Sequence, residues 1–134
     1  MGVKIKGKYA GDLRCLLTHQ TGEKIQTDAP LDNHGKGEAF SPTDLVAAAL
    51  GSCMLTIIAI RAQTKNIEIG NPTFNVTKEM NGLPRRIKEI AVEISFAQKL
   101  TTKDKLYLET EARKCPVALS ISPEIKQNIT FIYT

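Results

Sequence analysis

The hydrophobic pattern of this chain is dominated by residues 41–65, which read SPTDLVAAALGSCMLTIIAIRAQTK. Ser41 is a favourable N-cap, Pro42 suits the first helical position, and Asp44 can complete a shortened capping box. Between residues 45 and 60, the only residues outside the apolar set are Gly51, Ser52 and Thr56. No broad polar face remains, so the stretch predicts a central helix that is buried on every side.

Shorter runs of alternating apolar and polar residues predict strands on both sides of this helix. Before it, we expect a strand that begins at residues 3–6 and extends as far as Tyr9, followed by strands at 13–18 and 24–27 and a long loop from Asp28 to Phe40. After it, the patterns predict strands at 73–79, 85–96 and 129–133, a helix at 102–114 and a short helix that begins at Pro116. This order indicates one α+β domain that spans residues 1–134.

The central helix also bears on assembly. A helix that is apolar all round needs more cover than one chain of 134 residues can easily supply. We therefore expect a homodimer in which two central helices pack together inside antiparallel sheets from both chains. Obligate dimers commonly bury a core of this kind.

Composition limits the classes of binding partner and the cellular compartment that we expect. The net charge is only +4, Trp is absent, and no aromatic residues interleave with a basic run, so we expect no nucleic-acid partner. The N-terminal sequence MGVKIKGKYA lacks the apolar core of a signal peptide. The apolar run is shorter than the roughly 20 residues that span a bilayer, so we expect no membrane partner and a cytoplasmic protein.

Three cysteines, Cys15, Cys53 and Cys115, carry the candidate chemistry. None has metal-type C-x-x-C spacing, and His19 and His34 are isolated, so we expect no metal and no bound cofactor. A two-cysteine peroxidase needs one thiolate that attacks and a second thiol that resolves the sulfenic acid. Alternatively, each cysteine is a small buried hydrophobic residue, which is the interpretation we give Cys15.

The sequence resembles one known family. The segment GKGEAFSPTDLVAAALGSC, followed 62 residues later by CPV, is similar to the osmotically inducible protein C family, OsmC/Ohr. The resemblance covers nearly the whole chain and implies an intertwined homodimer with two central helices wrapped by sheets. It also implies thiol-dependent reduction of organic hydroperoxides, as a defence against oxidative stress, with re-reduction by a dithiol such as a dihydrolipoyl group.

The resemblance assigns roles to individual residues. Cys53 would be the peroxidatic cysteine, Cys115 the resolving one, and Arg14 the cation that favours a thiolate in apolar surroundings. Typical peroxidases of the family carry a glutamate ten residues before the first cysteine, but this chain has Thr43 there. Glu38, or else Asp44, is therefore the candidate partner of the arginine. The departure places the chain closer to the broader OsmC-like branch, and it leaves an alternative function, binding of a small apolar ligand without efficient peroxidase activity.

Overall fold

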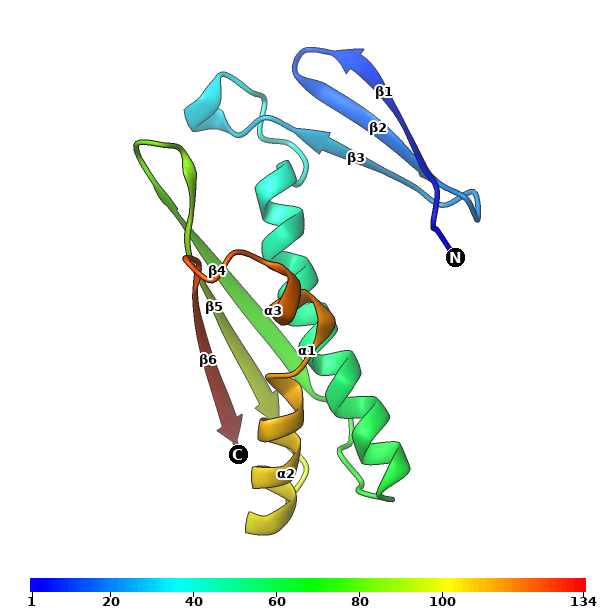
Figure 1. Ribbon diagram of the computed structural model, residues 1–134, viewed down its shortest axis with the longest axis vertical. Helices are drawn as coiled ribbons and strands as arrows, with labels where there is room; N and C mark the ends of the chain where they lie inside the picture. The colour runs from blue at the N-terminus through cyan, green and yellow to red at the C-terminus, as the bar shows by residue number, and fades with distance from the viewer. The chain divides into compact units, whose positions relative to one another are not determined.

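The computed structural model describes all 134 residues, which form two compact units, residues 1–46 and 47–134. The order of elements along the chain is the order predicted from the sequence (Figure 1). The assignment of the whole chain to one domain stays a prediction.

The first unit is a three-stranded antiparallel meander of β1 (Ile5–Gly11), β2 (Arg14–His19) and β3 (Lys24–Asp28). The strand register places alternate residues on opposite faces, so that one face is mainly apolar and the other is lysine-rich. The apolar face carries Ile5, Tyr9, Leu17 and Ile25. Because Ile5 and Tyr9 are 62% and 63% exposed, this face lacks a cover within one chain.

A loop joins β3 to the long helix α1 (Pro42–Thr64), which begins in the first unit. The loop contains a short 3-10 helix at Leu31–Asn33. The predicted cap is present: the Ser41 hydroxyl accepts the backbone N–H of Asp44, and the Asp44 carboxylate accepts the backbone N–H of Ser41. These two bonds fix where α1 begins.

The second unit contains a sheet with strand order β4-β5-β6, formed by Thr73–Asn81, Arg86–Phe96 and Lys126–Tyr133. Strands β4 and β5 are antiparallel, as a hairpin requires, whereas β5 and β6 are parallel. The expectation of purely antiparallel sheets is therefore wrong for this pair. The physical reason is the crossover between them, through α2 (Thr102–Ala112) and α3 (Pro116–Ser120), which returns the chain in the same direction.

The core of the second unit lies between this sheet and α1. Strand β5 supplies one face of buried side chains, namely Ile90, Val92, Ile94 and Phe96. Gly51 marks the closest approach of α1 to β4, because a Cβ at that position would lie 2.7 Å from the side chains of Phe74 and Val76. A residue without a side chain is therefore needed where the helix crosses the strand.

One chain supplies only part of the burial predicted for α1. One chain buries a single stripe of the helix, formed by Ala47, Leu50, Gly51, Met54, Ile58 and Ala62. Only 33% of its most apolar 18-residue window is buried, and Ile60 is 47% exposed. By length and composition alone α1 could cross a membrane, a property that the core helix of a soluble protein shares. Within one chain, the rest of its apolar surface is only partly covered.

Candidate functional site

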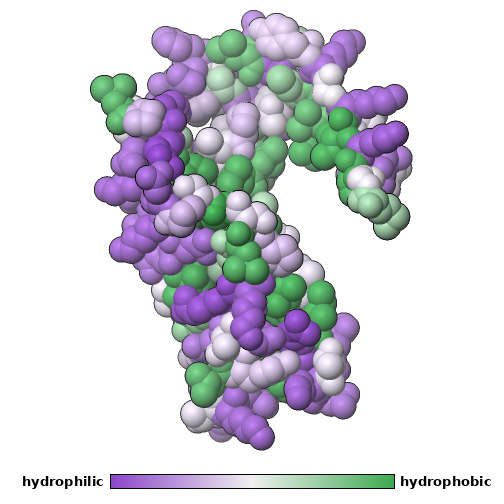
Figure 2. Space-filling view, in the orientation of Figure 1, coloured by the Kyte–Doolittle hydropathy of each residue, from purple (hydrophilic) through white to green (hydrophobic).

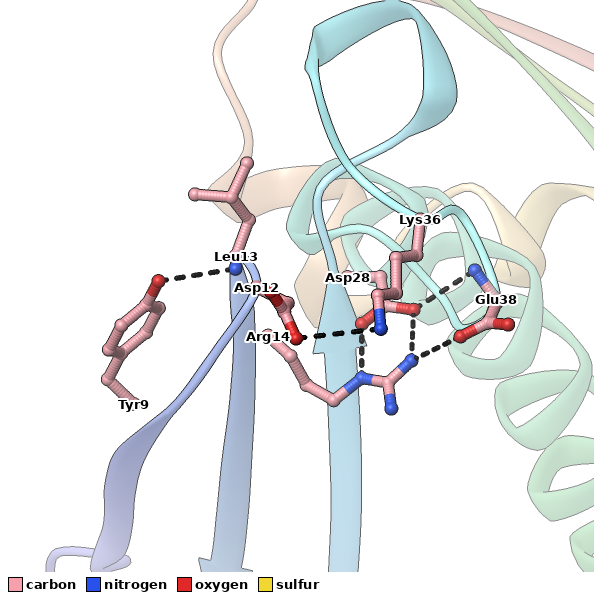
Figure 3. A network of polar contacts seen from close by, with 7 residues as sticks. All are labelled: Tyr9, Asp12, Leu13, Arg14, Asp28, Lys36 and Glu38. Atoms are coloured by element: carbon pink, nitrogen blue, oxygen red, sulfur yellow. Dashed lines mark hydrogen bonds and ion pairs between the residues drawn. The ribbon is translucent and has the colours of Figure 1, made fainter.

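Arg14 is the first residue of β2, directly after the tight turn that joins it to β1. Asp12 and Leu13 in this turn both have positive φ, 53° and 62°, and the backbone N–H of Leu13 donates to the Tyr9 hydroxyl at 3.3 Å. A two-residue turn with positive φ at both positions matches the twist of an antiparallel pair. The turn therefore fixes the strand end from which Arg14 projects (Figure 3).

The Arg14 guanidinium contacts two carboxylates. Its Nε donates to Oδ1 of Asp28 at 2.6 Å, and its Nη2 donates to Oδ2 of Asp28 at 2.8 Å. Nη2 also donates to Oε1 of Glu38 at 2.9 Å. The hydrogen bonds that Arg14 donates to Asp28 and then to Glu38 raise the pKa of Arg14, and the bond from Arg14 lowers the pKa of Asp28. The structure thus brings Arg14 and Glu38 together, as the sequence predicts, and adds a partner that the sequence analysis missed.

The missed residue is Asp28. The composition of residues 28–40 predicts that Asp28 begins the loop, whereas it is the last residue of β3 and its side chain is 1% exposed. Antiparallel register sets it directly opposite Arg14 on β2. One signal in the sequence could have found this pair. Arg14 lies at the start of one predicted strand and Asp28 follows the next, and residues opposite each other in a hairpin lie on the same face of the sheet.

Thr43 and Asp44 serve the start of α1. The Thr43 hydroxyl lies 3.2 Å from that of Ser41, and the Asp44 carboxylate completes the capping box described above. Between the two residues considered as the partner of Arg14, the structure places Glu38 on the guanidinium and Asp44 on the backbone of the N-cap.

Cys53 and Cys115 come together in the second unit. Cys53 is half-buried in the middle of α1, and Cys115 is fully buried immediately before α3. Although 62 positions separate them in the sequence, the two thiols are near enough that Cys53 raises the pKa of Cys115. Both are free thiols. Pro116 begins a new helix, α3, rather than continuing α2.

The Cys115 thiol has a structural partner as well. Its Sγ accepts the backbone N–H of Ala118 at 3.3 Å and so caps α3. Burial raises the pKa of Cys115, because a thiolate is disfavoured away from water, and the neighbouring Cys53 adds to the rise. The thiol form of Cys115 is thus favoured beside Cys53.

The remaining candidates lie elsewhere. Cys15 is half-buried on β2, opposite Tyr9 on β1 and Thr27 on β3. Nδ1 of His19 accepts the backbone N–H of Thr21 within its own turn. The structure contains no group of three or more His, Cys, Asp or Glu residues that could hold a metal ion.

Comparisons with known proteins agree with this architecture. Residues 35–130 match the family model described as OsmC-like protein. A crystal structure from Psychrobacter arcticus 273-4, of a protein provisionally named for an osmotic stress induced and detoxification response, shares 48% identity over 98% of this chain and 97% of its own, with a TM-score of 0.92.

Two more distant structures share the fold. An organic hydroperoxide resistance protein OsmC from Legionella pneumophila has a TM-score of 0.81 at 17% identity, covering 98% of this chain and 97% of its own. The organic hydroperoxide resistance protein of Bacillus subtilis has a TM-score of 0.71 at 17% identity, covering 98% of each chain. No curated protein matches this sequence. The chain belongs to the family of OsmC-like proteins.

Proposed function

We propose that this protein is a two-cysteine peroxidase that reduces organic hydroperoxides. The observation that carries the proposal is the meeting of Cys53 and Cys115, two free thiols from distant parts of the sequence, beside a helix break. Two structural cysteines need no such neighbour, whereas a peroxidatic and a resolving cysteine must approach closely enough for a disulfide to form. The hydroperoxide resistance named for fold relatives supports the same class.

In the first step, the Cys53 thiolate attacks the terminal oxygen of a hydroperoxide. The O–O bond breaks, the alkoxide takes a proton and leaves as an alcohol, and Cys53 becomes a sulfenic acid. In the second step, the Cys115 sulfur attacks the Cys53 sulfur, an S–S bond forms, and hydroxide leaves. The proton that Cys115 loses converts this hydroxide into water. The thiol form of Cys115, which burial favours, therefore supplies a proton that this step needs. An external dithiol, such as a dihydrolipoyl group, then reduces the disulfide.

The neighbours of Cys53 bear on the class of substrate, and Arg14 bears on how the Cys53 thiolate is favoured. The neighbours of Cys53 one helical turn away include Ala49, Leu50 and Ile57, which favour an alkyl peroxide over hydrogen peroxide. We assign Arg14, from the same protomer or from its partner, the role of favouring the Cys53 thiolate. Glu38 also accepts a hydrogen bond from Arg14.

The proposal includes a homodimer. Each chain leaves two apolar surfaces open, one on the meander and one on α1, and green apolar side chains are visible on the surface in Figure 2. Open apolar surfaces of this extent mark interaction sites. A second copy of the chain is the partner that the family resemblance implies.

A single-turnover experiment tests the peroxidase. Reduced wild-type protein is mixed with a small excess of cumene hydroperoxide, and loss of peroxide and of free thiols is followed with time. We expect one peroxide and two thiols to be consumed per chain. Cys53→Ser should abolish the reaction, Cys115→Ser should stop at one oxidised thiol, and Cys15→Ser serves as the matched control and should react like wild type.

The outcome separates the proposal from its alternative. If the wild-type protein leaves the peroxide intact, or if only Cys15→Ser loses activity, the peroxidase proposal is wrong. The function to test next would then be binding of a small apolar ligand, the second interpretation of the sequence.

A further inference from the structure

Asp28 is held more firmly than any other acidic residue around Arg14. Its carboxylate accepts two hydrogen bonds from the guanidinium and one from the backbone N–H of Glu38, at 3.0 Å. Its own backbone N–H donates to the carbonyl of Phe40 at 3.1 Å. A buried carboxylate with this many donors has one available orientation, and it holds β2, β3 and the loop together.

Glu38 is more exposed than Asp28 and accepts fewer hydrogen bonds from Arg14. Its side chain is 64% exposed, and the guanidinium donates only one hydrogen bond to it. Exposed ion pairs of this kind contribute little free energy, because water competes for both partners. The Glu38 carboxylate can therefore leave Arg14 without moving it, whereas the Asp28 carboxylate cannot.

The two carboxylates also determine which guanidinium donors are available. Arginine has five N–H groups, one on Nε and two on each terminal nitrogen. Nε donates to Asp28, and Nη2 donates to both Asp28 and Glu38, which uses every N–H on these two atoms. Nη1 donates to neither carboxylate, as Figure 3 shows. With Arg14 26% exposed, Nη1 is the atom able to meet a ligand.

We propose that Asp28 is the positioning residue of Arg14, that it holds the guanidinium so that Nη1 stays free to meet a ligand, and that Glu38 is dispensable for this positioning. This inference rests on the proposed peroxidase function. It reassigns the partner of the arginine from Glu38, the sequence-predicted residue, to an aspartate on the neighbouring strand.

The test compares Asp28→Asn, Asp28→Ser, Glu38→Gln and Arg14→Lys by kcat/KM for cumene hydroperoxide. Asp28→Asn keeps the size of the side chain, and Asp28→Ser keeps an acceptor for the loop while losing the second oxygen. Both should lower kcat/KM by about 100-fold, the scale of a misplaced catalytic group. Glu38→Gln should lower it by less than about fivefold, as expected for an exposed ion pair.

A second measurement reports the position of Arg14 independently of activity. The Nε–H resonance of Arg14, assigned by its absence in Arg14→Lys, should exchange slowly with solvent in wild type and in Glu38→Gln. It should exchange rapidly in both Asp28 variants. Asp12→Asn is the matched control, because Asp12 lies in the adjacent turn and is 77% exposed, and it should match wild type in both assays.

Three outcomes are informative. Loss of activity in Arg14→Lys and both Asp28 variants, with Glu38→Gln close to wild type, supports the inference. Loss in Arg14→Lys together with full activity in the Asp28 variants, or a larger loss in Glu38→Gln, overturns it and leaves the peroxidase intact. Wild-type activity in Arg14→Lys overturns the role of Arg14 itself, and this inference with it.

Discussion

Gly51→Ala tests the packing that places Cys53. The substitution adds one methyl group at the crossing of α1 and β4, two residues before the cysteine. The new Cβ would lie 2.7 Å from Cδ2 and Cε2 of Phe74 and 2.7 Å from Cγ2 of Val76. Favourable carbon contacts lie at about 3.5–4.0 Å, so the helix and strand would have to separate by roughly an ångström.

Two opposing effects set the size of the change. Alanine in a helix interior is favoured over glycine by about 1 kcal/mol. Overpacking a filled core costs about 1–3 kcal/mol, and an aromatic ring with a β-branched neighbour on the same strand gives way poorly. We therefore expect Gly51→Ala to lower the free energy of unfolding by about 1 kcal/mol, which for a chain of this size lowers Tm by about 4 °C.

Urea unfolding followed by circular dichroism measures this change. Ser52→Ala is the matched control, because Ser52 is exposed on the same helical turn and the substitution adds helix propensity without a clash. The control should be neutral or slightly stabilising. If Gly51→Ala instead stabilises the protein by about 1 kcal/mol, the helix propensity acts alone and the close packing is refuted.

Further predictions concern stability, reactivity and assembly. Met54 is fully buried, so Met54→Ala should cost about 2–5 kcal/mol in urea unfolding, and a cost below 1 kcal/mol would contradict its place in the core. Because Arg14 lowers the pKa of Asp28, the stability that this carboxylate contributes is present above about pH 4 and is lost as pH falls through the lowered folded pKa. Unfolding of Asp28→Asn should therefore depend less on pH below about pH 4 than that of wild type, and an unchanged acid dependence would exclude this linkage. Burial raises the pKa of Cys115, so its alkylation by iodoacetamide in Cys53→Ser should keep accelerating above about pH 9, and a plateau below that pH would contradict the burial. Ile60→Glu places a charge on the open face of α1 and should shift the protein toward monomers in analytical ultracentrifugation, whereas an intact dimer would place the interface elsewhere.

Local signals explain why most of the fold could be predicted. The cap at Ser41 and the alternation along β5 are properties of adjacent residues, and both are present in the structure. Asn66, two residues after the end of α1, has a φ of 54°, the left-handed conformation that asparagine tolerates. Cys53 and Cys115 could be paired only through the family resemblance, because their approach depends on how α3 is placed.

The errors arise where distant residues decide the outcome. The parallel pairing of β5 and β6 depends on the path of α2 and α3, which no local pattern records. Asp28 resembles the loop that follows it in composition, so strand and loop could not be separated there without the register of β2 and β3. Which stripe of α1 one chain buries could not be predicted either, because the helix is apolar on every side and the sequence pattern does not single out one face.

The central claim is that Cys53 and Cys115 react with each other after one of them meets a peroxide. The most direct measurement is peptide mapping by mass spectrometry after reduced protein is mixed with one equivalent of cumene hydroperoxide, with hydrogen peroxide in parallel. We expect a disulfide between Cys53 and Cys115 that forms faster with the organic peroxide, and an unmodified Cys15. Survival of both thiols, or oxidation confined to Cys15, would contradict the account.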